Sequence, residues 1–286
     1  MLTNKVSEIM TAEVMTAEAS STIFDVMEMM AAKNVGRAVI TEHQAPVGIF
    51  TEKDVLRRVM NKKLDPKKTG IKRVMTSPIR AVRRDAHIIE ALGKMYKGKF
   101  RHLLVRGDRG TIAGMVSMRR ILKLAVELGQ GLAETQTIGS IMSGAPITVD
   151  ASQSIYETVD TMTQKDTGCV VVLSGGKSKG IFTERDVLTR VAVKTIDTKK
   201  ALIQEVMTPD LVTASHTALV GEVLAKMYEH DFRNMPIVGD QGELIGIVSM
   251  GDVLKYAKGL NIDEGIRRAW KEIEEFWDSE EHYTPG

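Results

Sequence analysis

Apolar and polar positions follow a pattern that repeats four times along the 286-residue chain. In the first block, apolar residues recur at helical spacing over 23–30, and two short apolar runs follow at 38–41 and 47–50. A second helical stripe begins at Val55, and an extended stretch such as 147–149 precedes the first helix of a block. Helical spacing predicts amphipathic helices, and short apolar runs bounded by polar turns predict strands. The pattern therefore predicts the order β-α-β-β-α in each block.

The blocks are related by direct sequence repeats. GIFTEKDV at 48–55 aligns with GIFTERDV at 180–187, an offset of 132 residues (180 minus 48). A methionine opens each block, and these residues are Met10, Met75, Met142 and Met207. The repeat predicts two halves of two units each, with boundaries at 1–66, 67–130, 131–198 and 199–260.

A unit of this length is too small to cover both faces of its own sheet. We therefore expect the units to pack in pairs. The predicted fold class is α+β, built from α/β-type units, with residues 261–286 forming a C-terminal amphipathic helix. Trp270 and Trp277 lie on the apolar face of that helix, and such a face must be covered. The chain's own body, a second copy in a dimer and a target protein are the three candidates.

Composition narrows the class of protein. A formal net charge of +2 and 27% charged residues argue against a dedicated nucleic-acid binder and against wholesale disorder. Charge is uneven, however, since 53–84 carries twelve Lys/Arg and two acidic residues, whereas 263–281 carries eight acidic and three basic residues. No run approaches the roughly 18 apolar residues of a membrane span, and the N-terminus lacks the order of a signal peptide. Cys169 is the only cysteine. These features predict a cytoplasmic protein without an internal disulfide.

One motif carries candidate chemistry: Gly, two apolar residues, Thr or Ser, two variable residues and Asp. It occurs as GIFTEKD, GIFTERD and GIVSMGD, which end at Asp54, Asp186 and Asp252. A hydroxyl three residues before a carboxylate at a helix start is close to a capping box, which is a purely structural interpretation. Capping does not require the glycine, whose small size lets another group approach the backbone. Because a helix start binds phosphate and a carboxylate accepts hydrogen bonds from a diol, the motif also fits a nucleotide's ribose-phosphate.

The repeat, this motif and the Met-Thr or Met-Ser pair that opens each unit resemble the CBS domain family over residues 6–260. Pairs of CBS domains form a Bateman module. Four in one chain resemble the nucleotide-sensing gamma subunit of AMP-activated protein kinase and its stand-alone archaeal relatives. The resemblance implies two clefts in each pair, each combining the motif of one unit with the opening strand of its partner. It implies that the aspartate holds the ribose diol and that basic residues hold the phosphates of AMP, ADP or ATP.

Carried onto this sequence, the resemblance assigns nucleotide-binding residues to four clefts. In the second half, one cleft has Ser249, Asp252 and Arg233 with Thr148, and the other has Thr183 and Asp186 with Thr213. In the first half, one cleft has Thr51, Asp54 and Arg37, with Ala81 at the partner position, and the other has Ser117, Arg101 and His102 with Thr16.

The last of these clefts departs from the pattern, because GMVSMRR has Arg120 where the other units have aspartate. Arginine has only donors and cannot accept a hydrogen bond from a diol. The gamma subunit resembles this chain in having the same replacement in its second unit. We expect three clefts that bind ribose and a fourth that is empty or holds an anion. Arg101 and Arg233 each follow a phenylalanine, and the planar fork of an arginine suits bidentate phosphate binding.

The sequence has no metal-ligand spacing and no nucleophile with an adjacent base, so we expect no catalysis, no metal and no catalytic cofactor. The predicted function is energy sensing by adenine-nucleotide binding, with output through a protein partner or self-association. Three alternatives stay open. They are a scaffold whose clefts do not respond to ligand, a binder of S-adenosylmethionine, and an RNA binder acting through 53–84.

Overall fold

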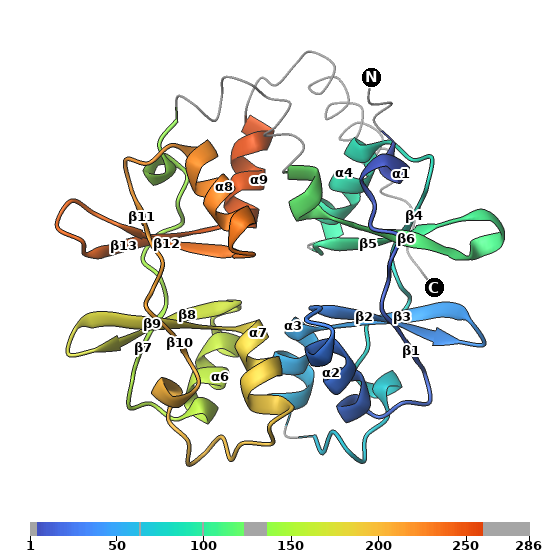
Figure 1. The fold of residues 1–286 in the computed structure, drawn as a ribbon, viewed down its shortest axis with the longest axis horizontal. Coiled ribbons are helices and arrows are strands. Elements are labelled where there is room, and N and C mark those ends of the chain that lie inside the picture. The colour runs from blue at the N-terminus through green and yellow to red at the C-terminus, as the bar shows by residue number, and fades with distance from the viewer. Residues whose placement is uncertain (1–4, 63, 99, 123–135, 260–286) are drawn as a thin grey trace.

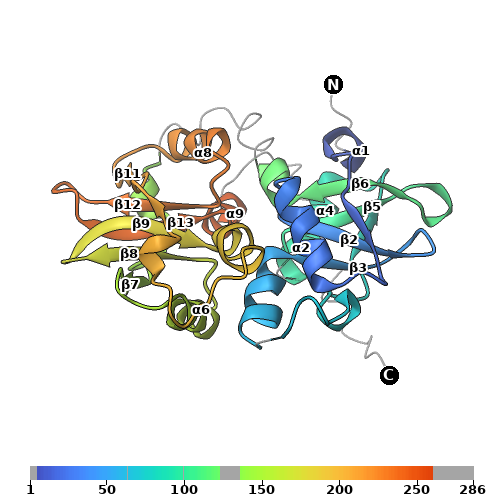
Figure 2. The same ribbon diagram turned by 60° about the horizontal axis from the view of Figure 1, so that its bottom comes forward.

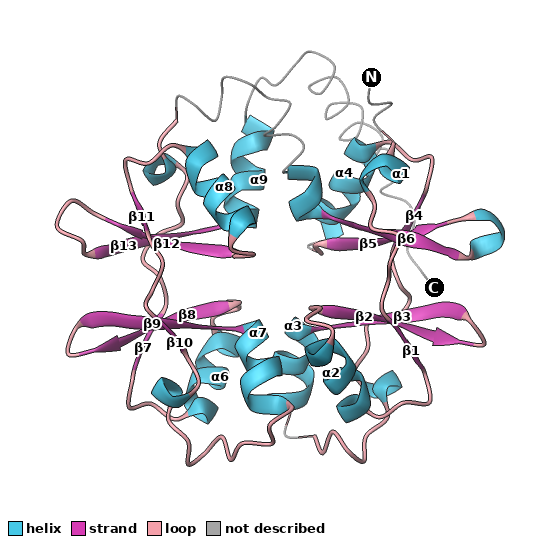
Figure 3. Cartoon of the chain, viewed as in Figure 1, coloured by secondary structure: helices cyan, strands magenta, loops and turns pink. Residues whose placement is uncertain are grey.

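The computed structural model of the chain describes residues 5–62, 64–98, 100–122 and 136–259. The four units form a flattened disc, with the first half on the right of Figure 1 and the second half on the left. Strands lie in the middle of each half and helices lie above and below them (Figure 3). The predicted C-terminal helix over 261–286 falls outside the described residues.

Unit one shows how the sequence forms these elements. Helix α2 (Ile23–Ala32) begins at Thr22, which forms a capping box with Asp25. The apolar stripe predicted for this helix is buried. Strand β1 (Thr16–Glu18) runs parallel to β2 (Arg37–Glu42), and β2 runs antiparallel to β3 (Ala45–Thr51). A short helix α3 (Glu52–Asp54) follows β3 without a break and completes the predicted order.

The other units repeat this arrangement, and a short helix α1 (Val6–Ile9) precedes unit one. Unit two contains β4 (Ala81–Arg83), α4 (Ile88–Gly98), β5 (His102–Arg106) and β6 (Ile112–Ser117). Unit three contains β7 (Thr148–Asp150), α6 (Ile155–Gln164), β8 (Cys169–Ser174), β9 (Lys177–Thr183) and α7 (Glu184–Asp186). Unit four contains β10 (Thr208–Pro209), β11 (Ala214–Ser215), α8 (Val220–Glu229), β12 (Asn234–Val238), β13 (Leu244–Ser249) and α9 (Met250–Gly259). The predicted fold class is confirmed.

The second helix of units one and three differs in detail from the sequence prediction. After α3 and α7 the chain winds as π-helices over Val55–Met60 and Val187–Ala192, with hydrogen bonds such as Asn61 N–H to the Leu56 carbonyl. Both π-helices bury their valines, and they pack against each other where units one and three meet. The wide turn is thus part of the contact between the two halves.

Each motif glycine lies where the partner unit crosses the sheet. A Cβ atom on Gly180 would lie 2.3 Å from the Thr208 carbonyl oxygen, and one on Gly246 would lie 2.4 Å from Met142 Sδ. Gly48 and Gly114 face the Met-Thr pairs of their partners in the same way. The group that the small residue admits is therefore the backbone of the partner unit. Antiparallel bridges accompany these approaches and join Thr11 to Met115, Thr76 to Ile49, Ser143 to Ile247 and Thr208 to Ile181.

Apolar cores join the units in two directions. Val39 and Leu104 belong to a small core between the sheets of units one and two. A larger core joins unit one to unit three and includes Val59 and Val191, and a matching core joins units two and four. The two halves consequently lie side by side (Figure 2), packed through their helices, which the sequence analysis did not predict. Within the described ranges, no helix has both the length and the hydropathy needed to cross a bilayer.

We expect Gly180→Ala to lower the free energy of unfolding by about 1–3 kcal/mol, because the added methyl group would press on the Thr208 carbonyl. Chemical denaturation measures the change. The matched control is Gly70→Ala, since Gly70 has φ −70° and ψ 147° and an added Cβ would meet nothing within 4 Å. Its stability should stay the same or rise slightly. An equal loss in both variants would contradict this account of the glycine.

Candidate functional site

The motif hydroxyl and carboxylate form a capping box in all three predicted copies. Thr183 Oγ1 and the Thr183 N–H donate to Asp186 Oδ2 at 2.7 and 2.9 Å, and Thr51 donates to Asp54 in the same way. Ser249 Oγ donates to Asp252 Oδ2 at 2.6 Å. The structural interpretation of the motif is therefore correct as far as Oδ2 is concerned.

The other carboxylate oxygen turns toward the partner unit or toward the next helical turn. Asp252 Oδ1 accepts a hydrogen bond of 2.6 Å from Ser143 Oγ, and Asp186 Oδ1 accepts one of 3.3 Å from Thr208 Oγ1. Nε of Arg190 lies 3.3 Å from Oδ1 of Asp186, and Nε of Arg58 lies 3.3 Å from Oδ1 of Asp54. The carboxylates are nearly buried, and burial raises the pKa of Asp54. Oδ1 is thus the carboxylate atom that could accept a hydrogen bond from a hydroxyl group of a ligand.

Arg190 and Arg58 are contributors that the sequence analysis missed. Nη1 of Arg190 donates to the Met207 carbonyl at 2.6 Å, and Nη1 of Arg58 donates to the Met75 carbonyl at 2.9 Å. Each arginine therefore connects the motif aspartate of its own unit to the opening of the partner unit. Their position four residues after the aspartate was a usable signal, because i and i+4 share a helix face.

Unit two has the predicted departure. The Arg120 N–H donates to Ser117 Oγ at 3.3 Å, so the cap is kept, while Arg120 Nη1 donates to Thr11 Oγ1 at 3.4 Å. Thr11 belongs to the Met-Thr pair of the partner unit, as Thr208 does in unit four. Arginine therefore contacts the same kind of partner hydroxyl that aspartate contacts elsewhere, but only as a donor.

Strand pairing brings the motif hydroxyl next to the first residue of the neighbouring strand. Arg37 pairs with Thr51, and His102 pairs with Ser117. Cys169 pairs with Thr183, and Asn234, which follows Arg233, pairs with Ser249. Directly opposed residues have Cα atoms about 4.5–5.5 Å apart. In unit one a basic residue therefore lies directly beside the motif hydroxyl, and in unit four a basic residue precedes the residue that does.

Basic residues from three units lie close together near the centre of the disc. They are Arg37 of unit one, Arg101 and His102 of unit two, and Arg233 of unit four. Burial, followed by the charge of Arg233, lowers the pKa of the Arg37 guanidinium to about 10. Burial and the charges of Arg37 and Arg101 hold the pKa of His102 well below its usual range, with a smaller effect from Arg233. Arg37 Nε donates to Met115 Sδ at 2.7 Å, and a thioether is a weak acceptor. This concentration of positive charge favours an anion.

Two glutamates, which the sequence analysis missed, also reach this centre. Arg101 Nη2 lies 3.0 Å from Glu184 Oε2, and Arg233 forms an ion pair with Glu52. Glu52 also accepts a hydrogen bond of 3.2 Å from Arg185 Nε. Each glutamate directly follows the motif residue that carries the hydroxyl. The sequence alone therefore identifies it only as an acidic residue in the first turn of a helix.

The remaining residues predicted for the clefts lie in or next to the opening strands of the units. Thr16 and Thr148 are exposed at the starts of β1 and β7, opposite Val39 and Val171. Thr213 is half-buried just before β11. Ala81 packs on the apolar core between the sheets of units one and two. Their participation in a ligand site stays a prediction.

Comparison with known proteins identifies the family. The family model for the CBS domain matches residues 6–61, 71–127, 138–193 and 203–259. The chain belongs to the CBS domain family. Among the described residues, no group of His, Cys, Asp and Glu side chains is arranged to hold a metal ion.

Known proteins resemble this chain in sequence, and one solved structure matches the four-unit fold. The CBS domain-containing protein CBSCBSPB1 of Arabidopsis thaliana is 24% identical over 316 residues, which cover 96% of this chain and 58% of the relative. The chain thus spans little more than half the length of that curated relative. A Methanocaldococcus jannaschii protein, a proposed archaeal homologue of g-AMPK, has a TM-score of 0.74 at 18% identity, covering 88% of this chain and 99% of its own. A CBS domain protein of Pyrobaculum aerophilum, solved in complex with AMP, is 28% identical with a TM-score of 0.38, covering 41% of this chain and 88% of its own.

The low pKa of His102 predicts a loss of stability in acid. The folded chain resists protonation of this imidazole, whereas the unfolded chain takes up the proton near its ordinary pKa of about 6.5. The contribution is therefore complete above that pH and is lost as the pH falls. Between pH 7 and pH 5 the free energy of unfolding should fall by up to about 2 kcal/mol from this source.

His102→Asn should reduce this loss, and asparagine is already present at the equivalent position, Asn234. Urea denaturation across this pH range measures the effect. His87→Asn, at an exposed histidine, is the control and should keep the wild-type pH dependence. The same acid sensitivity in His102→Asn and wild type would show that His102 is not the cause.

Proposed function

We propose that this CBS-domain chain binds adenine nucleotides in the clefts between paired units and acts as a regulator rather than as a catalyst. The observation that carries the proposal is the cross-strand pairing of motif hydroxyls with residues in or next to the basic cluster, as in Arg37 opposite Thr51. With Asp54 one helical turn further on, the site offers a carboxylate for a diol and a guanidinium for a phosphate. The adenine base is assigned from the family resemblance, because the described residues bear on the ribose and phosphate ends.

The two oxygens of each motif carboxylate support different parts of this proposal. Oδ2 is held by the cap, so the side chain is fixed before any ligand arrives, which reduces the entropy lost on binding. Among the described residues, Oδ1 of Asp186 makes two long contacts of 3.3 Å, to Thr208 and Arg190, which a ribose hydroxyl could replace. Oδ1 of Asp252 accepts a bond of 2.6 Å from Ser143, so a ligand there must displace a shorter hydrogen bond.

Regulation follows from the position of the clefts between units. A ligand that contacts two units favours the arrangement of the units in which it binds more tightly, and it can shift the equilibrium only by that difference in affinity. Because the chain spans little more than half of the curated relative described above, we place the regulated activity in a partner, in self-association or in further sequence.

The test is titration calorimetry with AMP, ADP and ATP on wild type and on Asp186→Ala and Asp252→Ala. Each substitution should remove one binding site, because it deletes the acceptor for the ribose diol. Each should also cost about 0.5–2 kcal/mol of stability through the lost cap. The matched control is Glu157→Ala, which breaks the exposed capping box at Ser154 and should leave nucleotide stoichiometry unchanged.

Unchanged stoichiometry in both aspartate variants would refute the ribose assignment. Absence of heat and of a thermal shift with all three nucleotides in wild type would favour the scaffold alternative. Binding of RNA in place of nucleotides would be recognised by a steep fall in affinity with salt.

A further inference from the structure

The residue after the motif hydroxyl alternates along the chain between acidic and apolar. It is Glu52 in unit one and Glu184 in unit three, but Met118 in unit two and Met250 in unit four. On the neighbouring strand, the residue just before the one that pairs with the motif hydroxyl alternates in the opposite sense. It is glycine at positions 36 and 168 and arginine at positions 101 and 233.

These two positions are neighbours in every unit. The Glu52 N–H donates to the Gly36 carbonyl at 3.1 Å, and the Met118 N–H donates to the Arg101 carbonyl at 2.9 Å. The same bond joins position 184 to 168 and position 250 to 233. Units one and three therefore present a carboxylate beside a glycine, and units two and four present a guanidinium beside a methionine.

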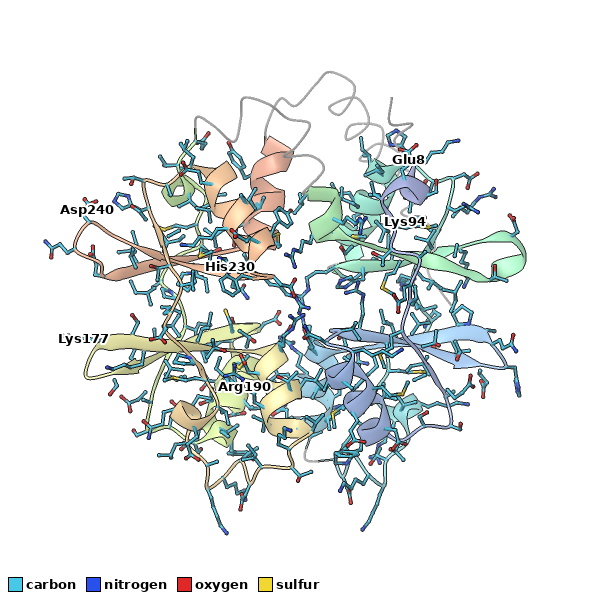
Figure 4. All side chains as sticks on the ribbon, in the orientation of Figure 1. Glu8, Lys94, Lys177, Arg190, His230 and Asp240 are labelled. Atoms are coloured by element: carbon cyan, nitrogen blue, oxygen red, sulfur yellow. The ribbon has the colours of Figure 1, made fainter. Side chains whose placement is uncertain are left out.

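The acidic and basic units meet across the diagonals of the disc. Arg101 of unit two contacts Glu184 of unit three at 3.0 Å, and Arg233 of unit four contacts Glu52 of unit one. Side chains from the four units converge in the middle of the ring (Figure 4). The sheet contacts join units within a half, and the helix contacts join units one to three and two to four. Units that lie on a diagonal are thus joined by ion pairs.

The glycine makes room for this contact. A Cβ atom on Gly36 would lie 2.7 Å from Arg233 Nη2 and 2.9 Å from the Glu52 carboxyl carbon. Both glutamates are almost fully buried, with exposed fractions of 2% for Glu52 and 5% for Glu184. A buried carboxylate without a partner is costly, so each glutamate depends on its arginine.

We propose that Glu52 and Glu184 occupy Arg233 and Arg101 in the ligand-free chain and that a nucleotide phosphate replaces them, so that phosphate binding and the diagonal ion pairs exclude each other. This inference rests on the proposed function, since Arg101 and Arg233 are the residues assigned to phosphate. A phosphate oxyanion satisfies the guanidinium as the carboxylate does, and it repels the glutamate it replaces. Each binding event then removes one contact across the disc, which couples occupancy to the relative position of the two halves.

The test compares ADP affinity in wild type and in the double variant Glu52→Gln, Glu184→Gln. Glutamine keeps the shape and an acceptor but lacks the charge that competes with phosphate. We expect ADP to bind about tenfold more tightly to the double variant, within the usual range of coupling between sites. The matched control is Glu157→Gln with Glu205→Gln, which removes the same charge from exposed helix caps and should change affinity little. Thermal unfolding checks that each variant is folded.

A second cycle separates local competition from a general increase in positive charge. In an Arg233→Met background, Glu52→Gln should give no gain in affinity, because the arginine for which the glutamate and the phosphate compete is missing. A persistent gain there, or an unchanged or weaker affinity in the double variant, overturns the proposal while leaving nucleotide binding intact. Binding by the double variant alone supports it, whereas absence of binding of AMP, ADP and ATP by either protein refutes both this inference and the proposed function.

Discussion

The disc depends on one reciprocal contact, in which the Met-Thr or Met-Ser opening of each unit lies across the glycine of its partner's third strand. At Gly180 the fit is so close that a single methyl group would approach the Thr208 carbonyl to 2.3 Å. The same segment supplies Thr208 Oγ1 to Asp186, so the contact that pairs the units also orients the carboxylate. Unit pairing and site geometry are consequently one constraint.

This constraint explains how a structural motif can also carry chemistry. The capping box uses Oδ2 of the aspartate and fixes the start of the helix, as the exposed carboxylates of Asp25 and Glu157 do in their own helices. What distinguishes Asp54, Asp186 and Asp252 is burial beside a second unit, which leaves Oδ1 facing the partner or the guanidinium of Arg58 or Arg190. A surface cap is surrounded by water, whereas these carboxylates lie in a site where a ligand hydroxyl can replace a protein donor.

Much of the fold was predictable because hydrophobic spacing and the repeat are local properties of the sequence. The π-helix at Val55–Met60 was not predictable, since the apolar positions of so short a segment fit an α-helical turn equally well. The aspartates and the basic residues were found because a repeated motif marks them. Glu52 and Glu184 were missed because an acid in the first helical turn already has a local explanation in the helix dipole. Arg233 lies 181 residues from Glu52, and only the packing of the two halves brings them together.

The two diagonals are chemically unequal, and this asymmetry bears on how the halves communicate. Glu52 accepts from both Arg233 and Arg185, and Arg185 also contacts Asp231, which pairs with Arg119, so this network reaches all four units. On the other diagonal, Lys53 replaces Arg185 in the repeat and lies 3.5 Å from Asp166 instead. Glu184 therefore lacks the counterpart of the Arg185 contact. If an anion takes Arg233, Glu52 keeps Arg185 as a partner, whereas the ion pair that holds Glu184 is lost when Arg101 is taken. An anion entering the centre therefore meets less opposition at Arg233 than at Arg101. The pseudosymmetric disc thereby acquires an order in which its sites respond.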